Sequence, residues 1–243
     1  MIFLRSTLFN IVFFTFTAIA CFLYLPTLVL PRDIYIKVLT WYFLALAWLE
    51  RKILNLDYEI RGYENLPDDG AYIVAAKHFS TFETMKLPIL LPDVSVILKR
   101  ELMWIPLWGW FAAKARMIPV IRGSRDKAVR SICKGAQQMK REKRPIAIFP
   151  QGTRVHLDDT PNEKPYKRGV VHMAVDADLD IYPLAHNSGV FWPRKSWIKK
   201  PGRIIFEFGP RIEKGKDKNE TLQNVQERLE TMSNSLIKEA KSK

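Results

Sequence analysis

The stretch AYIVAAKHFSTFETMKL, residues 71–87, decides the fold because it joins a buried strand to a helix through a short turn. Residues 71–76 are apolar and rich in residue types that favour strands. The segment Ser80 to Glu83 has the S-x-x-E pattern of a capping box, which marks the start of a helix. The stretch therefore predicts a strand–turn–helix unit, the element from which α/β folds are built.

The same alternation of strands and helices continues over residues 53–243. Short strand-forming runs lie at 56–62, 71–76, 94–98, 115–121, 145–149, 180–185 and 202–208. Helical patterns cover 80–91, 124–142, 169–177 and about 219–240. A chain of 243 residues has room for one sizeable core and an anchor. The sequence thus predicts a single α/β domain, with a central sheet of about seven strands flanked by helices.

Residues 1–52 differ in composition and predict a membrane anchor of one or two apolar helices. The 26 residues between Arg5 and Arg32 carry no charge, which as a helix is enough to cross a bilayer core of about 30 Å. The following apolar stretch, 33–52, is short for a crossing and contains Trp41 and Trp48. It is typical of an interfacial or returning helix. Whether the anchor crosses the membrane or re-enters stays open.

A cleavable signal peptide is the alternative for this segment, because AIAC at 18–21 resembles a cleavage site. The apolar run continues past Cys21 to Leu30, which is longer than the usual signal core and favours retention. Basic residues follow the first helix and predict that the rest of the chain lies on the cytoplasmic side of the membrane, which we expect to be the inner membrane of the cell. Two widely spaced cysteines, Cys21 and Cys133, fit a reducing compartment.

The formal net charge of +13 indicates a polyanionic partner: nucleic acid, an anionic membrane face or a phosphorylated substrate. A nucleic-acid surface would interleave basic and aromatic residues, whereas here the distinctive residues gather at strand ends, so no nucleic acid is expected. The histidines lack metal-ligand spacing and there is no glycine-rich nucleotide loop. We therefore expect neither a metal nor a cofactor.

His78 follows the strand at 71–76 directly, where α/β folds display reactive side chains. Glu83 lies five residues on, about 140° around a continuous helix, so the two side chains would not meet if both were helical. They meet if His78 lies in the turn. The capping box is the purely structural explanation of Glu83.

A second group of residues suits anion binding. The segment IAIFPQGTR, 146–154, is a strand that breaks at Pro150 into a glycine turn, and the guanidinium of Arg154 can hold a phosphate through two hydrogen bonds. Further basic side chains lie near glycines in KPYKRGV and MIPVIRG, namely Lys164, Lys167, Arg168 and Arg122. Single basic runs are usually only solvated surface, but these lie at strand ends or glycine turns.

Taken together, four blocks of sequence resemble the glycerolipid acyltransferase family, specifically the 1-acylglycerol-3-phosphate acyltransferases. The family motifs are commonly written N-H-x-S-x-x-D and F-P-E-G-T-R, and here KHFSTFE and FPQGTR stand in the same order. Two further blocks, ELMWIPLWGWF with MIPVIRG, and IYPLAHNSG, are similar to the second and fourth motifs. The resemblance covers roughly residues 53–210.

The resemblance implies a reaction and a role for several residues. His78 would be the general base that takes the proton from the sn-2 hydroxyl of lysophosphatidate as this oxygen attacks an acyl thioester, giving phosphatidic acid for phospholipid biosynthesis. Glu83 would orient the imidazole. Arg154, with Gly152 and Thr153, would hold the 3-phosphate. The donor would be acyl-ACP or acyl-CoA, with membrane lipid as a further partner.

Three positions depart from the common motifs: Lys77 replaces asparagine, Glu83 replaces aspartate and Gln151 replaces glutamate. Lys77 and Gln151 raise the local charge by two units and are counted with the substrate-binding residues, as are Arg122, Lys167 and Arg168. The same departures leave two alternatives: an acyltransferase for another lysolipid, such as a lyso-aminolipid, and a non-catalytic, membrane-tethered anion-binding module.

Overall fold

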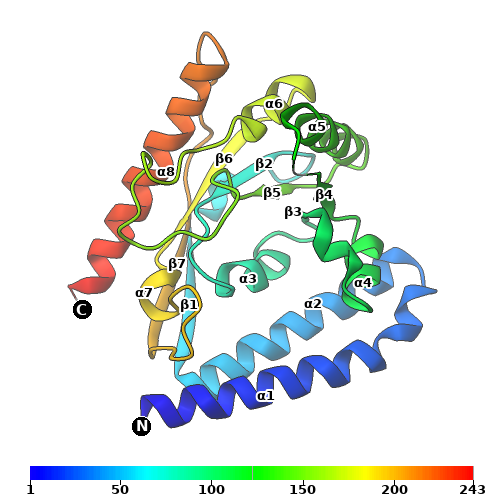
Figure 1. Ribbon diagram of the computed structural model, residues 1–243, viewed down its shortest axis with the longest axis vertical. Helices are drawn as coiled ribbons and strands as arrows, with labels where there is room; N and C mark the ends of the chain where they lie inside the picture. Colours follow the sequence, from blue (N-terminus) through cyan, green and yellow to red (C-terminus); the bar gives the residue numbers. More distant parts are fainter. Residues whose placement is uncertain (122, 243) are drawn as a thin grey trace.

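The computed structural model describes residues 1–121 and 123–242, without the side chain of Arg125, and over these ranges the chain forms one seven-stranded sheet (Figure 1). The strand order is β1-β7-β6-β2-β5-β3-β4, and all neighbours are parallel except β6 and β7. The strands are β1 Leu56–Arg61, β2 Ile73–Ala76, β3 Ser95–Lys99, β4 Ile118–Val120, β5 Ile146–Ile148, β6 Ile181–His186 and β7 Gly202–Phe208. The predicted α/β fold with about seven strands is confirmed.

Helices cover both faces of this sheet. Their bounds are α1 Ile2–Leu23, α2 Arg32–Leu49, α3 Phe82–Leu90, α4 Trp108–Lys114, α5 Arg125–Arg141, α6 Gly169–Asp176, α7 Ser188–Phe191 and α8 Lys218–Lys241. The four helices predicted from periodicity correspond to α3, α5, α6 and α8. Two short helices, α4 and α7, escape prediction because four to seven residues are too few to show a 3.6-residue period.

The sheet separates two apolar cores because successive side chains of a strand point to opposite faces. Ile73 and Ala75 of β2 pack in the core beneath α5, α6 and α8. Val74 and Ala76 pack in the core that contains residues of α1, α2 and α3. Both faces of β2 are therefore buried, which explains why its sequence is apolar throughout instead of alternating.

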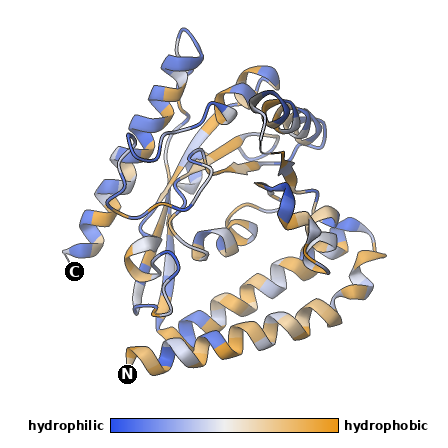
Figure 2. Ribbon diagram, viewed as in Figure 1, coloured by the Kyte–Doolittle hydropathy of each residue, from blue (hydrophilic) through white to orange (hydrophobic). Residues whose placement is uncertain are grey.

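The first two helices form an antiparallel hairpin beside the α3 face of the sheet, and Figure 2 shows that it is mostly hydrophobic. Among the described residues, α1 is the one helix long and apolar enough to cross a membrane. Near its start, Ser6 Oγ accepts from the amide of Lys199 at 2.9 Å. Beyond its end, Lys114 Nζ donates to the carbonyl of Leu30 at 2.7 Å. The segments at both ends of α1 thus contact the α/β part of the chain.

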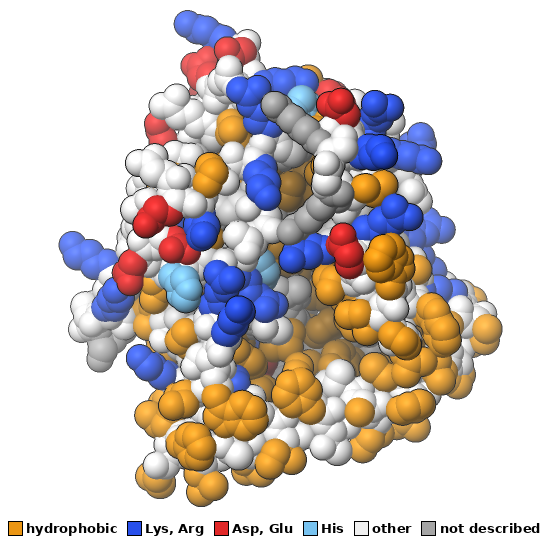
Figure 3. Space-filling view, in the orientation of Figure 1, with side chains coloured by type: hydrophobic (Ala, Val, Ile, Leu, Met, Phe, Trp, Pro, Cys, Tyr) orange, Lys and Arg blue, Asp and Glu red, His pale blue; other side chains and the backbone are white. Residues whose placement is uncertain are grey.

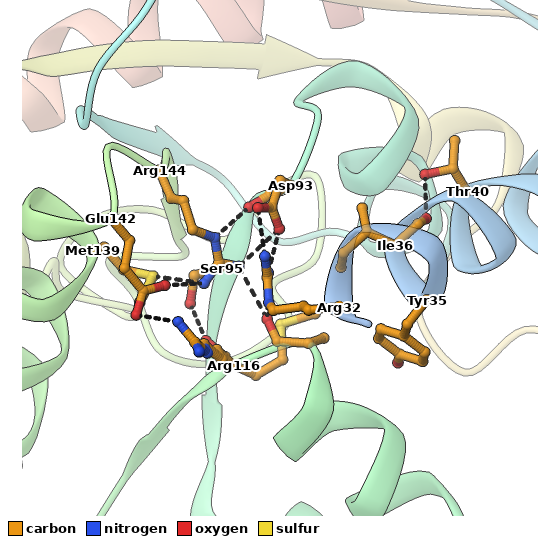
Figure 4. Close-up of polar contacts among 12 residues, drawn as sticks. Arg32, Tyr35, Ile36, Thr40, Asp93, Ser95, Arg116, Met139, Glu142 and Arg144 are labelled. Carbon is orange, nitrogen blue, oxygen red and sulfur yellow. Dashed lines mark hydrogen bonds and ion pairs between the residues drawn. The ribbon is translucent and has the colours of Figure 1, made fainter. Parts of the chain in front are cut away.

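A network of charged side chains holds the start of α2 against the sheet (Figure 4). Arg32 donates to Asp93 at 2.7 Å, and Arg144 lies 3.1 Å from the same carboxylate. Arg144 also pairs with Glu142, which in turn pairs with Arg116. The start of α2 is therefore joined through ion pairs to residues just before β3 and β5.

The end of α2 is held by a different contact, a fully buried ion pair. Lys86 of α3 donates through Nζ to Glu50, which begins the π-helical turn Glu50–Leu54 after α2. The ammonium group also lies 4.4 Å from the centre of the Phe82 ring. Both side chains are at most 1% exposed. This pair connects the hairpin to the helix whose first turn carries Glu83.

Candidate active site

The candidate site lies where β2, β5 and β6 end, since these three strands are parallel neighbours whose carboxyl ends meet at one edge of the sheet. His78 lies in the turn between β2 and α3, as the sequence predicts. Its Nδ1 is 2.7 Å from Glu83 Oε1, and its ring stacks on Phe149 with 4.1 Å between ring centres. These two contacts fix the plane of the imidazole.

Glu83 is 1% exposed and accepts hydrogen bonds at both carboxylate oxygens. The Ser80 amide donates to Oε1 at 2.7 Å, while the hydroxyls of Ser80 and Ser188 donate to Oε2 at 2.8 Å each. Burial alone would raise the pKa of Glu83, but the hydrogen bonds to His78 and Ser80 and the positive charge that the histidines can carry outweigh it and lower the pKa to about 2. A carboxylate only accepts, so His78 Nδ1 donates and Nε2 keeps its lone pair.

The capping and orienting roles of Glu83 therefore coexist in one geometry. As in a capping box, Glu83 accepts from the amide of Ser80, three residues earlier. The hydroxyl of Ser80 accepts from the amide of Phe82 at 3.0 Å. The helix begins at Phe82 with Thr81 at its N-cap, one residue later than the capping box predicts. The same Oε1 also accepts from His78, so neither explanation of Glu83 excludes the other.

Two buried residues at the end of β6 complete this network and were not predicted. His186 Nε2 donates to the carbonyl of Lys77 at 2.8 Å, and its Nδ1 lies 3.1 Å from Ser188 Oγ. Burial lowers the pKa of His186 below its ordinary value, which favours the neutral ring. The signal in the sequence was the fourth block, IYPLAHNSG, which places His186 as the last residue of β6 and Ser188 just past it, much as His78 lies just past β2.

The loop after β5 brings basic side chains to the same edge. Gly152 has φ +68°, which favours glycine. A Cβ at this position would lie 3.0 Å from Lys167 Nζ, so the ammonium of Lys167 lies against the loop. Val155 N donates to the His78 carbonyl at 2.7 Å, which ties the loop to the turn that holds the histidine.

Arg154 is the residue of this loop that contacts the histidine turn through its side chain. Its Nε donates to the Ser80 carbonyl at 3.1 Å. The two terminal amino groups of Arg154 make no hydrogen bond to any other described residue. These two groups are the ones that can bind a phosphate through paired hydrogen bonds. Arg194, which the sequence analysis did not select, donates to the Arg154 carbonyl at 2.8 Å and adds a cation.

The remaining predicted substrate-binding residues differ in whether they are buried or exposed. Lys77 is 1% exposed and donates to Glu230 of α8 at 2.9 Å. Gln151 is also buried, and its amide donates to the Lys164 carbonyl at 3.2 Å. Thr153 is partly exposed and Arg168 is exposed, whereas Arg122 lies outside the described residues. The structure thus brings Thr153, Arg154 and Lys167 to the accessible loop and buries Lys77 and Gln151.

The arrangement places a candidate base and a candidate anion site on one accessible edge. His78 is 16% exposed, and its Nε2 is the atom that can accept a proton. Arg154, which contacts the turn that holds His78, can bind a phosphate. Figure 3 shows a group of basic side chains above a hollow, with hydrophobic side chains of the α1–α2 hairpin below. Within the described residues, no group of three His, Cys, Asp or Glu side chains is arranged to hold a metal ion.

Comparisons with known proteins show the family of this chain. The sequence model of the Acyltransferase family matches residues 57–187. The chain is 35% identical over 163 residues to the 1-acyl-sn-glycerol-3-phosphate acyltransferase of Pseudomonas aeruginosa, covering 67% of this chain and 62% of that protein. It is 33% identical over 133 residues to the protein of the same name from Saccharomyces cerevisiae, and this match covers 54% of this chain and 43% of that protein. The match thus spans less than two thirds of either relative.

A solved structure has the same fold over nearly the whole chain. The crystal structure of the 1-acyl-sn-glycerophosphate (LPA) acyltransferase PlsC from Thermotoga maritima superposes with a TM-score of 0.78. It covers 97% of this chain and 99% of that one, with 18% sequence identity. The likeness includes the hairpin of α1 and α2, since so little of the chain is left out. Because the family model spans more than half of the sequence and includes both His78 and Arg154, the chain belongs to the acyltransferase family.

Proposed function

We propose that this protein transfers a fatty acyl group from an acyl thioester to the sn-2 hydroxyl of 1-acylglycerol 3-phosphate, which makes phosphatidic acid. The observation that carries the proposal is the His78–Glu83 pair beside an arginine whose terminal amino groups are available to a phosphate. The names of the relatives from Pseudomonas and yeast support the same acceptor.

In the proposed reaction, His78 Nε2 takes the proton of the acceptor hydroxyl while the oxygen attacks the thioester carbonyl. Glu83 accepts from Nδ1 throughout, so it keeps the tautomer and stabilises the imidazolium that forms. Collapse of the tetrahedral intermediate breaks the carbon–sulfur bond, and the imidazolium returns its proton to the thiolate. The products are an ester and a free thiol, and no acyl-enzyme is required.

The head group would be held by the loop after β5. We place the 3-phosphate against Arg154, with Lys167 and the backbone at Gly152 and Thr153 on the same loop. Arg168 is exposed nearby in sequence and adds positive charge. Lys77 and Gln151 have buried partners, so we assign them to shaping the two loops instead of contacting substrate.

Lysophosphatidate-dependent release of thiol from an acyl thioester tests the proposal. Membranes that contain the protein should release thiol when lysophosphatidate is added, with both acyl-ACP and acyl-CoA tried as donors. Competition among lysophosphatidate, neutral lysolipids and a lyso-aminolipid would then identify the acceptor. Preference for a lyso-aminolipid would replace the proposed acceptor, and binding without thiol release would favour a non-catalytic anion-binding module.

The substitution Arg154→Lys should raise the KM for lysophosphatidate by about tenfold or more. Lysine keeps the charge but loses the planar pair of donors, and charge-assisted hydrogen bonds contribute about 1.5–3 kcal/mol. The KM for the acyl donor should change much less, because the thioester does not depend on this contact. Equal effects on both substrates would show that Arg154 holds the loop through the Ser80 carbonyl and not the phosphate.

We further propose that residues 1–52 hold the protein in the inner membrane, with the catalytic domain, residues 53–243, on the cytoplasmic side. The apolar surface of α1 and α2 supports membrane attachment. Contacts from Ser6 to Lys199 and from Leu30 to Lys114 join both ends of α1 to the catalytic part. We infer that α1 lies in the membrane plane and does not place its ends on opposite sides.

High salt should therefore leave the protein on membranes. Salt screens charges but does not weaken burial of an apolar helix in lipid, so a wash at about 1 M salt, where the Debye length is about 3 Å, should release little protein. The measurement is the fraction pelleted with membranes before and after the wash. Release into the wash would contradict anchoring by residues 6–31, and a mature chain that begins near Cys21 would support a cleaved signal peptide.

A further inference from the structure

Six of the seven tryptophans of this protein are exposed, by 39% to 72% of their surface, and Trp192 is the buried exception. Three of the six, Trp104, Trp108 and Trp110, lie within seven residues, together with the exposed Ile105. We call residues 104–110 the tryptophan segment. None of its side chains takes part in the proposed chemistry, and exposed apolar clusters of this kind mark contact surfaces.

The backbone presents these side chains through a specific and strained conformation. Leu107 has φ 63° and ψ −59°, and Trp108 N donates to the Pro106 carbonyl at 2.7 Å, which closes a γ-turn of the rare, strained kind. Gly109 N donates to Ile105 O at 2.8 Å. A Cβ at Gly109 would lie 2.0 Å from the Met103 carbonyl, so only glycine fits there. The exposure is therefore built into the fold of the segment.

The tryptophan segment adjoins the hairpin of α1 and α2. Phe111, the next residue, stacks on Tyr35 of α2 with 6.3 Å between ring centres, and Tyr35 donates through its hydroxyl to the Phe111 carbonyl at 2.7 Å. Lys114 reaches the carbonyl of Leu30 between α1 and α2. In Figure 3 the hydrophobic side chains around α4 continue into those of the hairpin. The two regions thus form one apolar surface.

Cations border the tryptophans on this surface. The Arg100 guanidinium lies 6.0 Å from the centre of the Trp104 ring, and Lys99 precedes it as a second exposed cation. Tryptophan prefers the boundary between lipid tails and head groups, and lysine or arginine beside it attracts anionic head groups. The combination fits the interface of an anionic bilayer better than a purely apolar protein partner.

We propose that the tryptophan segment enters the head-group region of an anionic membrane as a second contact, separate from α1 and α2. The inference rests on the membrane attachment proposed above and gives the segment a role of its own. A hairpin alone leaves the catalytic domain free to tilt about the hairpin axis. A second contact beside α2 removes this freedom and fixes the height of the site above the lipid.

A spin label at residue 104 tests this placement directly. The label is attached to Trp104→Cys in a full-length chain with Cys21→Ser and Cys133→Ser, reconstituted in vesicles that contain anionic phospholipid. The matched control is Val175→Cys on α6, an exposed apolar residue on the opposite side of the sheet from the hairpin. We expect the label at 104 to collide with oxygen, which dissolves in lipid, more than with a water-soluble nickel complex, and the label at 175 to show the reverse.

Other occupants of the surface give different results. If both labels favour the water-soluble complex, the segment lies outside the membrane and the proposal is overturned. A short distance between two labels at residue 104, measured by pulsed dipolar spectroscopy, would show instead that a second copy covers the segment. The accessibility measurement does not use catalysis, so it remains decisive even if the acceptor assignment fails.

A kinetic comparison tests the consequence for the reaction. In Trp104→Ser/Trp110→Ser, we expect the KM for lysophosphatidate embedded in vesicles to rise by about tenfold, equivalent to about 1.4 kcal/mol. The activity of this double variant with a short-chain, water-soluble lysophosphatidate should stay unchanged. In the control variant Val175→Ser, activity with both forms of the acceptor should stay unchanged. Equal loss with both acceptors would place the segment in the catalytic machinery, and no loss with either would show that the membrane does not use it.

Discussion

His78→Ala should lower the turnover number by about 100- to 10,000-fold, the range expected when a general base is removed. In the proposed reaction, Nε2 of His78 accepts the proton. No other base lies beside it in the described part of the chain, because His186 is fully buried and its Nε2 donates to the Lys77 carbonyl. The protein should stay folded and membrane-bound, because His78 is partly exposed and its main contacts are one ring stack and one hydrogen bond.

The measurement is steady-state thiol release by the purified variant, with circular dichroism as the test of folding. His172→Ala is the matched control, because this histidine lies in α6 and approaches Lys218, away from the β2 turn. Its turnover should remain near that of the parent chain. Near-normal turnover in His78→Ala would exclude this residue as the base.

Glu83→Gln separates the orienting role of this residue from its capping role. The amide keeps the shape of the side chain but loses the charge that stabilises the imidazolium and can donate to Nδ1, which would favour the wrong tautomer. A large loss of turnover with little loss of stability would support orientation of His78. Equal losses in both would mean that the contacts to Ser80 and Ser188 are what the fold requires.

The second large effect concerns stability: Glu50→Gln should lower the free energy of unfolding by about 3–5 kcal/mol, the usual result of removing one partner from a buried ion pair. The Lys86 ammonium would stay in a site with no exposure to water, facing the Phe82 ring and a neutral amide. Burial already lowers the pKa of Lys86, and Glu50 is the main charge that opposes this shift, with a smaller contribution from Asp57. The variant should therefore denature at lower temperature and lower denaturant concentration.

Two further variants make this prediction specific. The double change Glu50→Leu/Lys86→Met removes both charges and should recover most of the lost stability, because apolar replacement of a whole buried pair is often neutral or stabilising. Lys140→Met breaks the exposed pair with Asp178 and should cost only about 0–1 kcal/mol. A loss in Glu50→Gln no larger than in Lys140→Met would show that the buried pair contributes little to the link between the hairpin and α3.

The local pattern of the sequence was sufficient for the strands and the longer helices of the fold, but not for the short helices α4 and α7. Short strand-forming runs bounded by turn residues predicted all seven strands. The signal is clearest in the central strand β2, because burial on both faces leaves a continuous apolar run. The meeting of His78 and Glu83 was also predictable, because it depends on one turn and five residues. The antiparallel position of β7 beside β6 had no such local signal.

Only the tertiary structure decided which of the predicted substrate-binding residues are accessible. Lys77 and His78 are neighbours just past β2, yet Lys77 is buried against Glu230 on α8, 153 residues later in the chain, whereas His78 pairs with Glu83 and stays partly exposed. Arg194 and Ser188 also join the site through contacts between segments far apart in the chain, 40 residues apart for Arg194 and Arg154 and 105 for Ser188 and Glu83. The sequence alone thus determined the strands, the turn that carries His78 and the glycine loop that carries Arg154, because each depends on neighbouring residues. Burial and pairing depend on which distant segments pack together, and that is set by the assembled sheet and its covering helices.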